Sequence, residues 1–431
     1  MNSTNPMFDR LRSGHRRAAG FSLLEMLVAL FITTMVMVGV LEMFQMNATL
    51  ARKQTLIADM QQNMRIGLYD ILRYARMAGR GGLPAFLAPD QAASPAFGGT
   101  LLPDGVAISI QNNVPAGTTV GGNPVLPGSD ILTLRGVLFG PIFQVQSNTE
   151  DFSNRRLQLD MLALGVPQDL QDIADATLTP GSSETLVLVS SRGATLYGLA
   201  EIAGGGSIQT APDAQGNIQT VGVTVPFTAS GARFTDYKDL MRSGLFPTEM
   251  TAVAYMGVLE EYRYYVRATP IDPTDPTSGI VPRLSRARFY PGSQTVHPSN
   301  PTAREDIADN VWDLQIALGV DRNNDGEALE GTTSATRRTD EWLYNDSQDQ
   351  LDDPGTPGAW QWNGNNNPLH SLRVNLLVRS ERPEIQYVSE PIDRIEDSIY
   401  NEPVTPPGLT ELAQRRYRRR LMQATVDFRN F

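Results

Sequence analysis

The 431-residue chain contains no cysteine, three histidines and no recognisable motif for a serine or threonine nucleophile. Without cysteine, disulfides, cysteine-based zinc sites and thiol nucleophiles are excluded. The histidines His15, His297 and His370 have no metal-ligand spacing, and we expect His297 and His370 to lie in loops or at the surface. No residue therefore supports an enzymatic function, and we expect a protein that is not an enzyme.

Other features that often carry chemistry are also weak. Gly204-Gly205-Gly206 lacks the lysine and hydroxyl residue that follow in a phosphate-binding loop, so it predicts a flexible turn. Adjacent carboxylates such as Glu260-Glu261 and Asp352-Asp353 are common surface features, and we expect them at the surface.

Charge is distributed unevenly along the chain. The formal net charge of −11 argues against a general nucleic-acid-binding surface. The first 20 residues hold four arginines and one acid, a net charge of +3, which leaves −14 for the remainder. A short basic leader before an acidic body suggests processing and export.

An apolar run follows the leader. No charge occurs from Met26 to Leu41, and with the flanking Phe21–Leu24 the run reaches about the 20 residues that a membrane helix needs. The arginines before it predict an N-terminus in the cytoplasm, with the bulk of the chain outside the inner membrane.

Glu25 lies inside this run, near its start, where a carboxylate costs a few kcal/mol unless it finds a partner. One explanation is that Glu25 sits at the membrane interface and touches water. Another is that it pairs with a positive group. If the chain is cut after Gly20, the free amine of Phe21 is four residues away, in the same chain or in a neighbouring subunit.

The segment Gly20-Phe21-Ser22-Leu23-Leu24-Glu25, followed by an apolar helix, resembles the class III signal of type IV prepilins and type II secretion pseudopilins. The resemblance implies cleavage between Gly20 and Phe21 by prepilin peptidase and methylation of the Phe21 amine. It also implies that Glu25 registers subunits during assembly. An ordinary secretory signal would instead place a small-residue cleavage site after the apolar stretch. No clear site of that kind follows Leu41.

The helix is expected to continue well beyond the membrane. No proline interrupts Phe21–Ala78, and a glycine-rich segment ends the pattern from Gly79. Its second half carries an amphipathic stripe that we expect to pack on the body, formed by Leu50, Ile57, Met60, Met64, Leu68, Ile71, Leu72 and Ala75. The predicted layout is a leader (1–20), a transmembrane or filament-core helix (21–44), an amphipathic helix (45–79) and an extracytoplasmic β-rich domain (80–431).

The body is expected to consist of strands and long loops. Residues 84–128 read as loop with a short strand near Val106–Ile110. Further strands are predicted at Ile131–Leu138, Thr185–Ser190, Val221–Pro226, Thr251–Val258, Tyr262–Ala268, Val311–Val320 and Ser371–Ser380, the last of which nearly alternates apolar and polar residues. The fold class is therefore α+β, with one long N-terminal helix packed on a mainly antiparallel, pilin-like β-sheet body.

The C-terminal half is similar to the PilW group of minor pilins. The segments that carry this similarity are Tyr264-Tyr265-Val266, Pro282-Arg283-Leu284-Ser285-Arg286, Ile307–Gln315, Gly319-Val320-Asp321, Leu372-Arg373-Val374, Leu377–Ser380, Arg418-Arg419 and Thr425–Asn430. The similarity implies a structural minor pilin that acts at or near the pilus tip and helps other minor pilins to prime polymerisation. The implied partners are prepilin peptidase, other minor pilins, the major pilin, the inner membrane and the pilus assembly platform, but not nucleic acid.

Two alternative functions stay open. A type II secretion minor pseudopilin of the J type would share the N-terminus and a similar body. A membrane-tethered periplasmic binding protein or adhesin would not be cut after Gly20.

No cofactor is required by these motifs, and calcium is the one candidate ion. Asp321, Asn323 and Asp325, followed by a glycine, match the first half of a calcium loop. The twelfth position is Thr332, where a helix-loop-helix site has glutamate. A calcium site and a plain Asx/Gly turn both remain open.

Two residue clusters allow more than one interpretation. The basic run Arg415–Arg420 predicts a solvated helix face that pairs with acidic neighbours or another subunit, with DNA contact as the alternative. Trp342, Trp360 and Trp362 lie in a polar, glycine-rich segment, where they pin a loop onto the sheet or form an exposed binding surface.

Overall fold

The structure is a computed structural model. It describes residues 22–83, 107–140, 142–145, 156–160, 184–190, 197–202, 207–212, 218–228, 253–272, 274–292, 294–298, 304–321, 325, 328, 341–343, 369–384, 387–392, 394–400 and 415–428. The chain divides into two units, residues 1–58 and 59–431.

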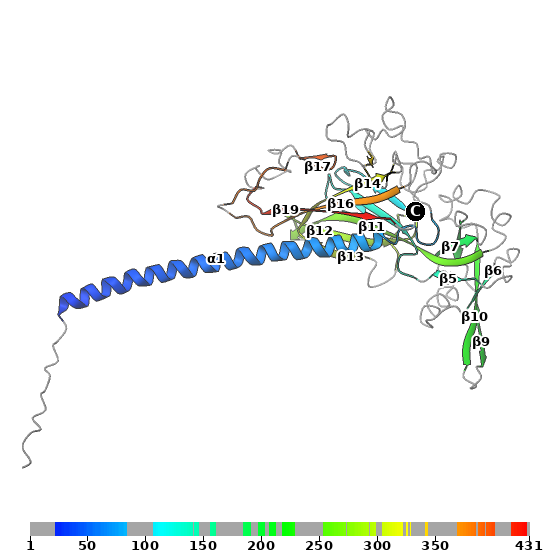
Figure 1. Cartoon of the computed structure of the whole chain (residues 1–431), viewed down its shortest axis with the longest axis horizontal. Coiled ribbons are helices and arrows are strands. Elements are labelled where there is room, and N and C mark those ends of the chain that lie inside the picture. The colour runs from blue at the N-terminus through cyan, green and yellow to red at the C-terminus, as the bar shows by residue number, and fades with distance from the viewer. Residues whose placement is uncertain are drawn as a thin grey trace, which may run out of the picture. The chain divides into compact units, whose positions relative to one another are not determined.

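The first unit is helical. Helix α1 begins at Leu23 and ends at Ala75, so its first 36 residues belong to this unit (Figure 1). Leucine, methionine and alanine recur along it and proline is absent, which favours a helix. Threonine hydroxyls such as those of Thr33 and Thr34 bond to carbonyls three or four residues earlier, which satisfies them inside an apolar segment.

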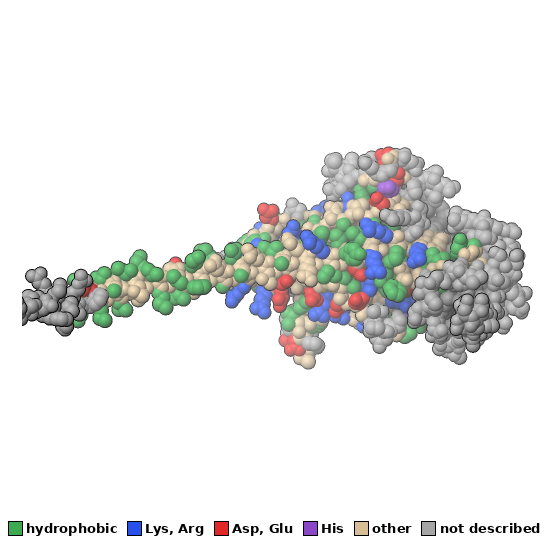
Figure 2. Space-filling view, turned by 60° about the horizontal axis from the view of Figure 1, so that its bottom comes forward, with side chains coloured by type: hydrophobic (Ala, Val, Ile, Leu, Met, Phe, Trp, Pro, Cys, Tyr) green, Lys and Arg blue, Asp and Glu red, His purple; other side chains and the backbone are tan. Residues whose placement is uncertain are grey.

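None of residues 22–58 is buried, and apolar side chains cover much of the surface of this helix (Figure 2). By length and composition α1 can cross a membrane. The predicted helix is thus confirmed over Leu23–Ala75. Turns follow to Gly82, where the positive φ angles of Gly79, Gly81 and Gly82 suit glycine.

The second unit holds an 11-stranded antiparallel sheet. Its main path runs β1-β4-β11-β7-β8-β10-β6, with β5 and β12 also paired to β11, β13 to β12 and β9 to β10. The strands are β1 (Ile108–Gln111), β4 (Ile131–Gly136), β5 (Ile142–Gln144), β6 (Arg156–Asp160), β7 (Thr185–Ser190), β8 (Tyr197–Ile202), β9 (Ser207–Pro212), β10 (Ile218–Thr228), β11 (Val253–Asp272), β12 (Asp275–Phe289) and β13 (Arg304–Asp309).

A second, four-stranded antiparallel sheet follows the order β15-β14-β16-β19. Its strands are β14 (Val311–Val320), β15 (Trp342–Leu343), β16 (Leu369–Arg379) and β19 (Arg419–Asp427). Two short ribbons complete the described elements: β2 (Thr119–Val120) with β3 (Asn123–Pro124), and β17 (Arg394–Ile395) with β18 (Ser398–Ile399). The expected α+β class, a long helix on antiparallel sheets, is confirmed.

The last turns of α1 lie over one apolar core that both sheets share. From the helix, Met60, Met64, Leu68, Ile71 and Ala75 are buried in it. From the sheets, the core receives Leu132, Leu134, Tyr264, Leu284, Leu314, Val374 and Leu376 among others. Each large apolar side chain buried in this way contributes about 1.5–3 kcal/mol. The predicted stripe therefore enters the core from Met60 onward, whereas Leu50 and Ile57 are exposed.

Several strand predictions are confirmed and one is wrong. The predicted strands Thr185–Ser190 and Val311–Val320 coincide with β7 and β14. The segments Thr251–Val258 and Tyr262–Ala268 are not two strands but parts of the single 20-residue β11. The intervening Glu260 and Glu261 do not break the strand because both are buried and paired.

Candidate assembly site

The helix N-terminus is closed by a reciprocal pair of hydrogen bonds. The Ser22 backbone N–H donates to Glu25 Oε2 at 2.9 Å, and the Glu25 backbone N–H donates to Ser22 Oγ at 3.2 Å. This is a capping box, which satisfies two backbone donors that a helix start leaves without partners. The Ser-x-x-Glu spacing carries this signal, and the sequence reasoning missed it. Gly20 and Phe21 lie outside the described residues.

The cap satisfies hydrogen bonds but leaves the charge of Glu25 uncompensated. Among the described residues the carboxylate accepts a hydrogen bond only from the neutral Ser22 amide, because the Ser22 hydroxyl bonds to the Glu25 backbone N–H instead. The described residues therefore place no cation beside this carboxylate at the start of the apolar helix.

At the other end, α1 approaches the sheets closely at Gly67. A Cβ placed there would lie 2.8 Å from Leu284 Cδ2 of β12 and 3.3 Å from Leu376 Cδ1 of β16. It would also lie 3.5 Å from Ala308 Cβ of β13. Glycine thus lets the helix backbone sit between the two sheets, where a larger residue would push it away.

Three residues then fix the helix to the large sheet. Arg286 Nη1 on β12 donates to both carboxylate oxygens of Asp70 on α1 at 3.0 Å, and the Tyr264 hydroxyl on β11 donates to Asp70 Oδ2 at 2.8 Å. Arg286 Nη2 also donates to Glu305 on β13 at 2.6 Å. The Arg286 guanidinium lies over the Tyr74 ring, 4.5 Å from its centroid.

The electrostatics of this cluster follow from its partial burial. The side chains of Arg286 and Asp70 are 9% and 20% exposed. Burial raises the pKa of Asp70, and the nearby Arg286 guanidinium offsets part of that rise. Burial, reinforced by the Asp70 charge, raises the pKa of the Tyr264 hydroxyl, which therefore stays a donor.

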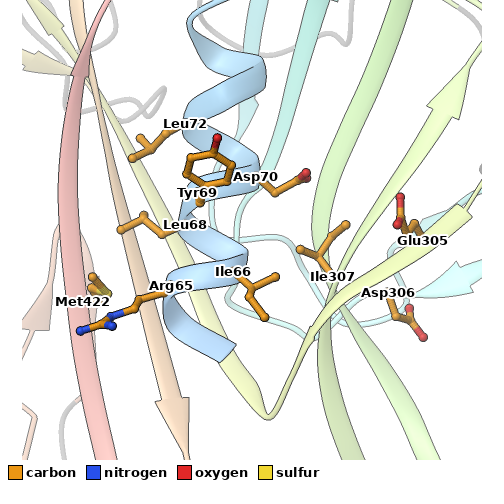
Figure 3. Close-up of a pocket in the computed structure, with 10 residues that line it drawn as sticks. All are labelled: Arg65, Ile66, Leu68, Tyr69, Asp70, Leu72, Glu305, Asp306, Ile307 and Met422. Atoms are coloured by element: carbon orange, nitrogen blue, oxygen red, sulfur yellow. The ribbon is translucent and has the colours of Figure 1, made fainter. Parts of the chain in front are cut away.

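An open groove of about 620 Å³ follows the exposed side of this helix segment (Figure 3). Arg65, Leu68 and Leu72 form its side toward β19, with Met422 opposite, whereas Ile66 and Asp70 face β13. Tyr69 is 71% exposed. The groove combines an apolar floor with charged rims, as expected of a contact surface more than of a catalytic cleft.

Comparison with known families identifies this architecture. Residues 15–41 match the prokaryotic N-terminal methylation motif, and residues 263–430 match the model for type IV pilus-assembly protein W. The chain therefore carries a prepilin-type N-terminus and a PilW-like region. No curated protein and no solved structure gives a significant match.

The two matches support a minor pilin associated with the type IV pilus. The methylation motif covers the capped start of α1, and the PilW region covers β12 to β19 with the end of β11. This region therefore supplies Tyr264 and Arg286, which hold the helix. The matches imply processing by prepilin peptidase and contact with pilus components, and they suit a single-pass inner-membrane protein whose role is structural.

A buried ion cluster that the sequence did not predict lies at the border of the PilW region, which contributes Arg263 and Gly292 to it. Glu261, expected at the surface, is fully buried and accepts hydrogen bonds from Arg135 at 2.6 Å, Arg263 at 2.7 Å and the Gly292 amide at 2.7 Å. Burial alone would raise the pKa of Glu261, but the two guanidinium groups lower it below its usual value. The expectation was wrong because Arg135 is 126 residues away and could not be paired with Glu261 by inspection.

Other candidate residues of the pilin-like chain serve packing. His297 lies in a loop, as one of the two expectations had it, but is buried, with its Nε2 2.6 Å from Glu184 Oε1. His370 lies half-buried in strand β16 and not in a loop. Trp342 is buried on the sheet beneath the Arg373 guanidinium, in line with the loop-pinning interpretation. Trp360 and Trp362 lie outside the described residues.

The candidate calcium segment is described only in part. The Asp325 backbone N–H donates to Asp321 Oδ1 at 3.1 Å, a bond that spans four residues and so is longer than that of an Asx turn. Asn323 lies outside the described residues. Across the described part of the chain, no three His, Asp or Glu side chains come together in a way that could hold a metal.

The basic run does not form the predicted helix face. Arg419 begins strand β19, and residues 416–418 form the approach to it. The expected pairing with acids holds for Arg418, whose Nη2 lies 3.1 Å from Glu384 Oε2. The prediction of a helix was wrong here because strand β19 begins within the basic run.

Proposed function

We propose that this minor pilin joins other minor pilins at or near the pilus tip and helps to prime polymerisation. The observation that carries the proposal is the start of α1, an exposed apolar helix whose first turn holds a capped but uncompensated carboxylate. A carboxylate gives a helix that stays in the bilayer no stabilising contact. In a helix that moves into a filament, the same carboxylate can pair with a positive group of a neighbouring subunit.

We propose that Glu25 registers the subunit through its charge. In hydrocarbon a carboxylate costs a few kcal/mol, and the Ser22 amide does not neutralise it. Cleavage between Gly20 and Phe21 would create an amine four residues away, in the same chain or in the next subunit. An ion pair across subunits would favour one axial position of the helix over its neighbours.

The proposal also includes processing and localisation. The basic leader stays in the cytoplasm, prepilin peptidase removes residues 1–20 and methylates Phe21, and the body lies in the periplasm until the assembly platform adds it to a pilus. The PilW match supports a pilus over a type II secretion pseudopilus. A tethered binding protein or adhesin would keep its leader.

Two substitutions separate the charge of Glu25 from its capping role. Glu25→Gln keeps a side-chain oxygen for the Ser22 amide but removes the charge. Ser22→Ala removes one capping bond but keeps the charge. In a deletion strain complemented with each variant, we expect Glu25→Gln to abolish incorporation into sheared pili and Ser22→Ala to retain most of it.

The opposite pattern, with Gln active and Ser22→Ala inactive, would show that Glu25 acts only as a helix cap. Pilus numbers, counted by electron microscopy, test priming itself. The deletion strain should make few pili, and unchanged piliation would overturn the proposed function.

A further inference from the structure

The second unit has two edge strands beside the end of α1, and they differ in how well they are protected. β13 has six residues, a register shift against β12 between Leu284 and Ser285, and exposed charges. Asp306 on β13 is bonded to Arg267 at 2.7 Å and to Ser285 at 2.7 Å. Short length, irregular pairing and charge are the features by which proteins keep a strand edge from pairing with other chains.

β19 has little of this protection along Leu421–Asp427. It has nine residues, no proline and an unbroken nine-residue register with β16. Leu421 is 44% exposed, and Gln423 and Thr425 are exposed as well. Long, regular edges of this kind are templates for an added strand.

The register determines which backbone groups face outward. The Phe428 N–H donates to the His370 carbonyl, and the Ser380 N–H donates to the Arg418 carbonyl. Even-numbered residues of β19 therefore point their N–H and C=O groups toward β16, because these groups alternate in antiparallel pairs. Leu421, Gln423 and Thr425 point theirs to the open edge, where no described residue bonds to them.

Four arginines, here called the arginine cluster, lie where β16 ends and β19 begins, with Arg379 and Arg420 on opposite faces of the sheet. Arg379, Arg382, Arg416 and Arg420 have no carboxylate partner among the described residues, although the chain carries a net charge of −11. The Arg379 guanidinium lies between the Trp312 and Tyr417 rings, 3.8 and 4.5 Å from their centroids. Burial lowers the pKa of Arg379 to about 10, a cost that a nearby anion would relieve.

We propose that the outer edge of β19 accepts an extended segment of another pilus subunit as an additional antiparallel strand. The C-terminal end of that segment carries acidic residues, which lie against Arg416 and Arg420. Antiparallel pairing places this end at the arginine cluster, because β19 begins there. The inference rests on the proposed function, since it names a partner surface for the assembling subunit.

A second copy of this chain fits the surface less well. If two β19 edges paired antiparallel about Gln423, each arginine cluster would meet only Asp427 of the other copy. One carboxylate does not match the two guanidinium groups of Arg416 and Arg420. A different, more acidic segment therefore fits better.

Photocrosslinking in the native host tests the surface on the full chain. A benzophenone amino acid replaces Leu421 or Thr425 on β19, and Arg304 on the protected edge β13 serves as the matched control position. We expect one adduct from β19 and none from β13. Mapping the crosslinked peptide should find a segment of another pilus subunit with acidic residues on its C-terminal side.

Backbone and charge variants make the test specific. Gln423→Pro removes an outward N–H without affecting the pairing with β16, whereas Gln423→Ala keeps it. Proline should lower the adduct yield about fivefold, the equivalent of about 1 kcal/mol for one lost hydrogen bond, and alanine should not. Arg416→Glu combined with Arg420→Glu should lower it by about tenfold or more, because like charges then face each other.

The inference is overturned if proline and alanine give equal yields. It is also overturned if the adduct joins two copies of this chain or leads to residues 401–414 of the same chain. Incorporation of the unsubstituted chain into pili, measured in parallel, separates this failure from failure of the proposed function.

Discussion

Arg286 of β12 donates to both carboxylate oxygens of Asp70 on α1 at 3.0 Å, across 216 residues of sequence. The pair joins the last turns of α1 to the PilW region. Arg286 is 9% exposed and also lies over the Tyr74 ring, so the connection combines an ion pair with ring packing.

Removal of Arg286 should loosen the body. In a fragment that starts at Asp59, Arg286→Ala should lower the free energy of unfolding by about 3 kcal/mol, because it leaves Asp70 partly buried without its cation. Arg267→Ala, which breaks the more exposed pair with Asp306, should cost less than about 1 kcal/mol. Urea denaturation measures both, and equal losses would contradict a special role for the Asp70 pair.

Replacing Gly67 with a larger residue should destabilise the body. Gly67→Val places methyl groups against Leu284 and Leu376, and overpacking of this kind costs about 1–3 kcal/mol. Gly140→Val is the control, since a Cβ at Gly140 meets nothing within 4 Å. The thermal midpoint of the same fragment should fall for the first variant only; an unchanged midpoint for Gly67→Val would mean that the helix can shift without cost.

Asp313 should make the body less stable as pH rises. Burial raises the pKa of this β14 carboxyl to about 7, although the Gln315 amide and the Leu314 backbone N–H lower it. The folded state then holds a proton that the unfolded chain, with a pKa of about 3.9, releases. The stabilising effect of that proton is fully present below the unfolded pKa and is lost as pH rises from about 4 to 7.

Asp313→Asn removes this linkage. We expect the variant to gain about 1–3 kcal/mol at about pH 8 and to show a flatter profile above about pH 5. Glu261, whose pKa is lowered, acts in the opposite sense only below its usual range, so the two effects separate. If the free energy of unfolding of the variant and the parent depends on pH in the same way, the proton is bound elsewhere. Asp130 is one candidate, because burial also raises its pKa.

Calcium discriminates between the two interpretations of residues 321–325. Binding to the folded state alone would stabilise the fragment by about 2.7 kcal/mol at a hundredfold excess over Kd. A calcium site predicts a higher melting temperature in about 10 mM calcium than in chelator, with the difference lost in Asp325→Ala. Equal melting temperatures would leave the segment as a turn.

Local patterns could be read from the sequence, whereas long-range pairing could not. β7 and β14 coincide with predicted strands because apolar residues dominate both. β12 was missed because Pro276, Gly279 and Pro282 suggest turns, although the strand runs through all three. Its 15 residues are held by pairing with β11, which no local pattern records.

The candidate site divides in the same way. The motif around Gly20 and Glu25 is local and is visible in the sequence. The contacts of Asp70 with Tyr264 and Arg286 span 194 and 216 residues, so no spacing rule could bring them together. The capping bond from Ser22 was predictable in principle, since only the Ser-x-x-Glu pattern is needed.

The most direct test of the account is the N-terminal peptide of the mature protein, isolated from membranes and from sheared pili and analysed by mass spectrometry. We predict that it begins at Phe21 and carries one methyl group on its α-amine. A chain that retains Met1, or one that is cut beyond Leu41, would contradict the assignment of this protein as a processed minor pilin.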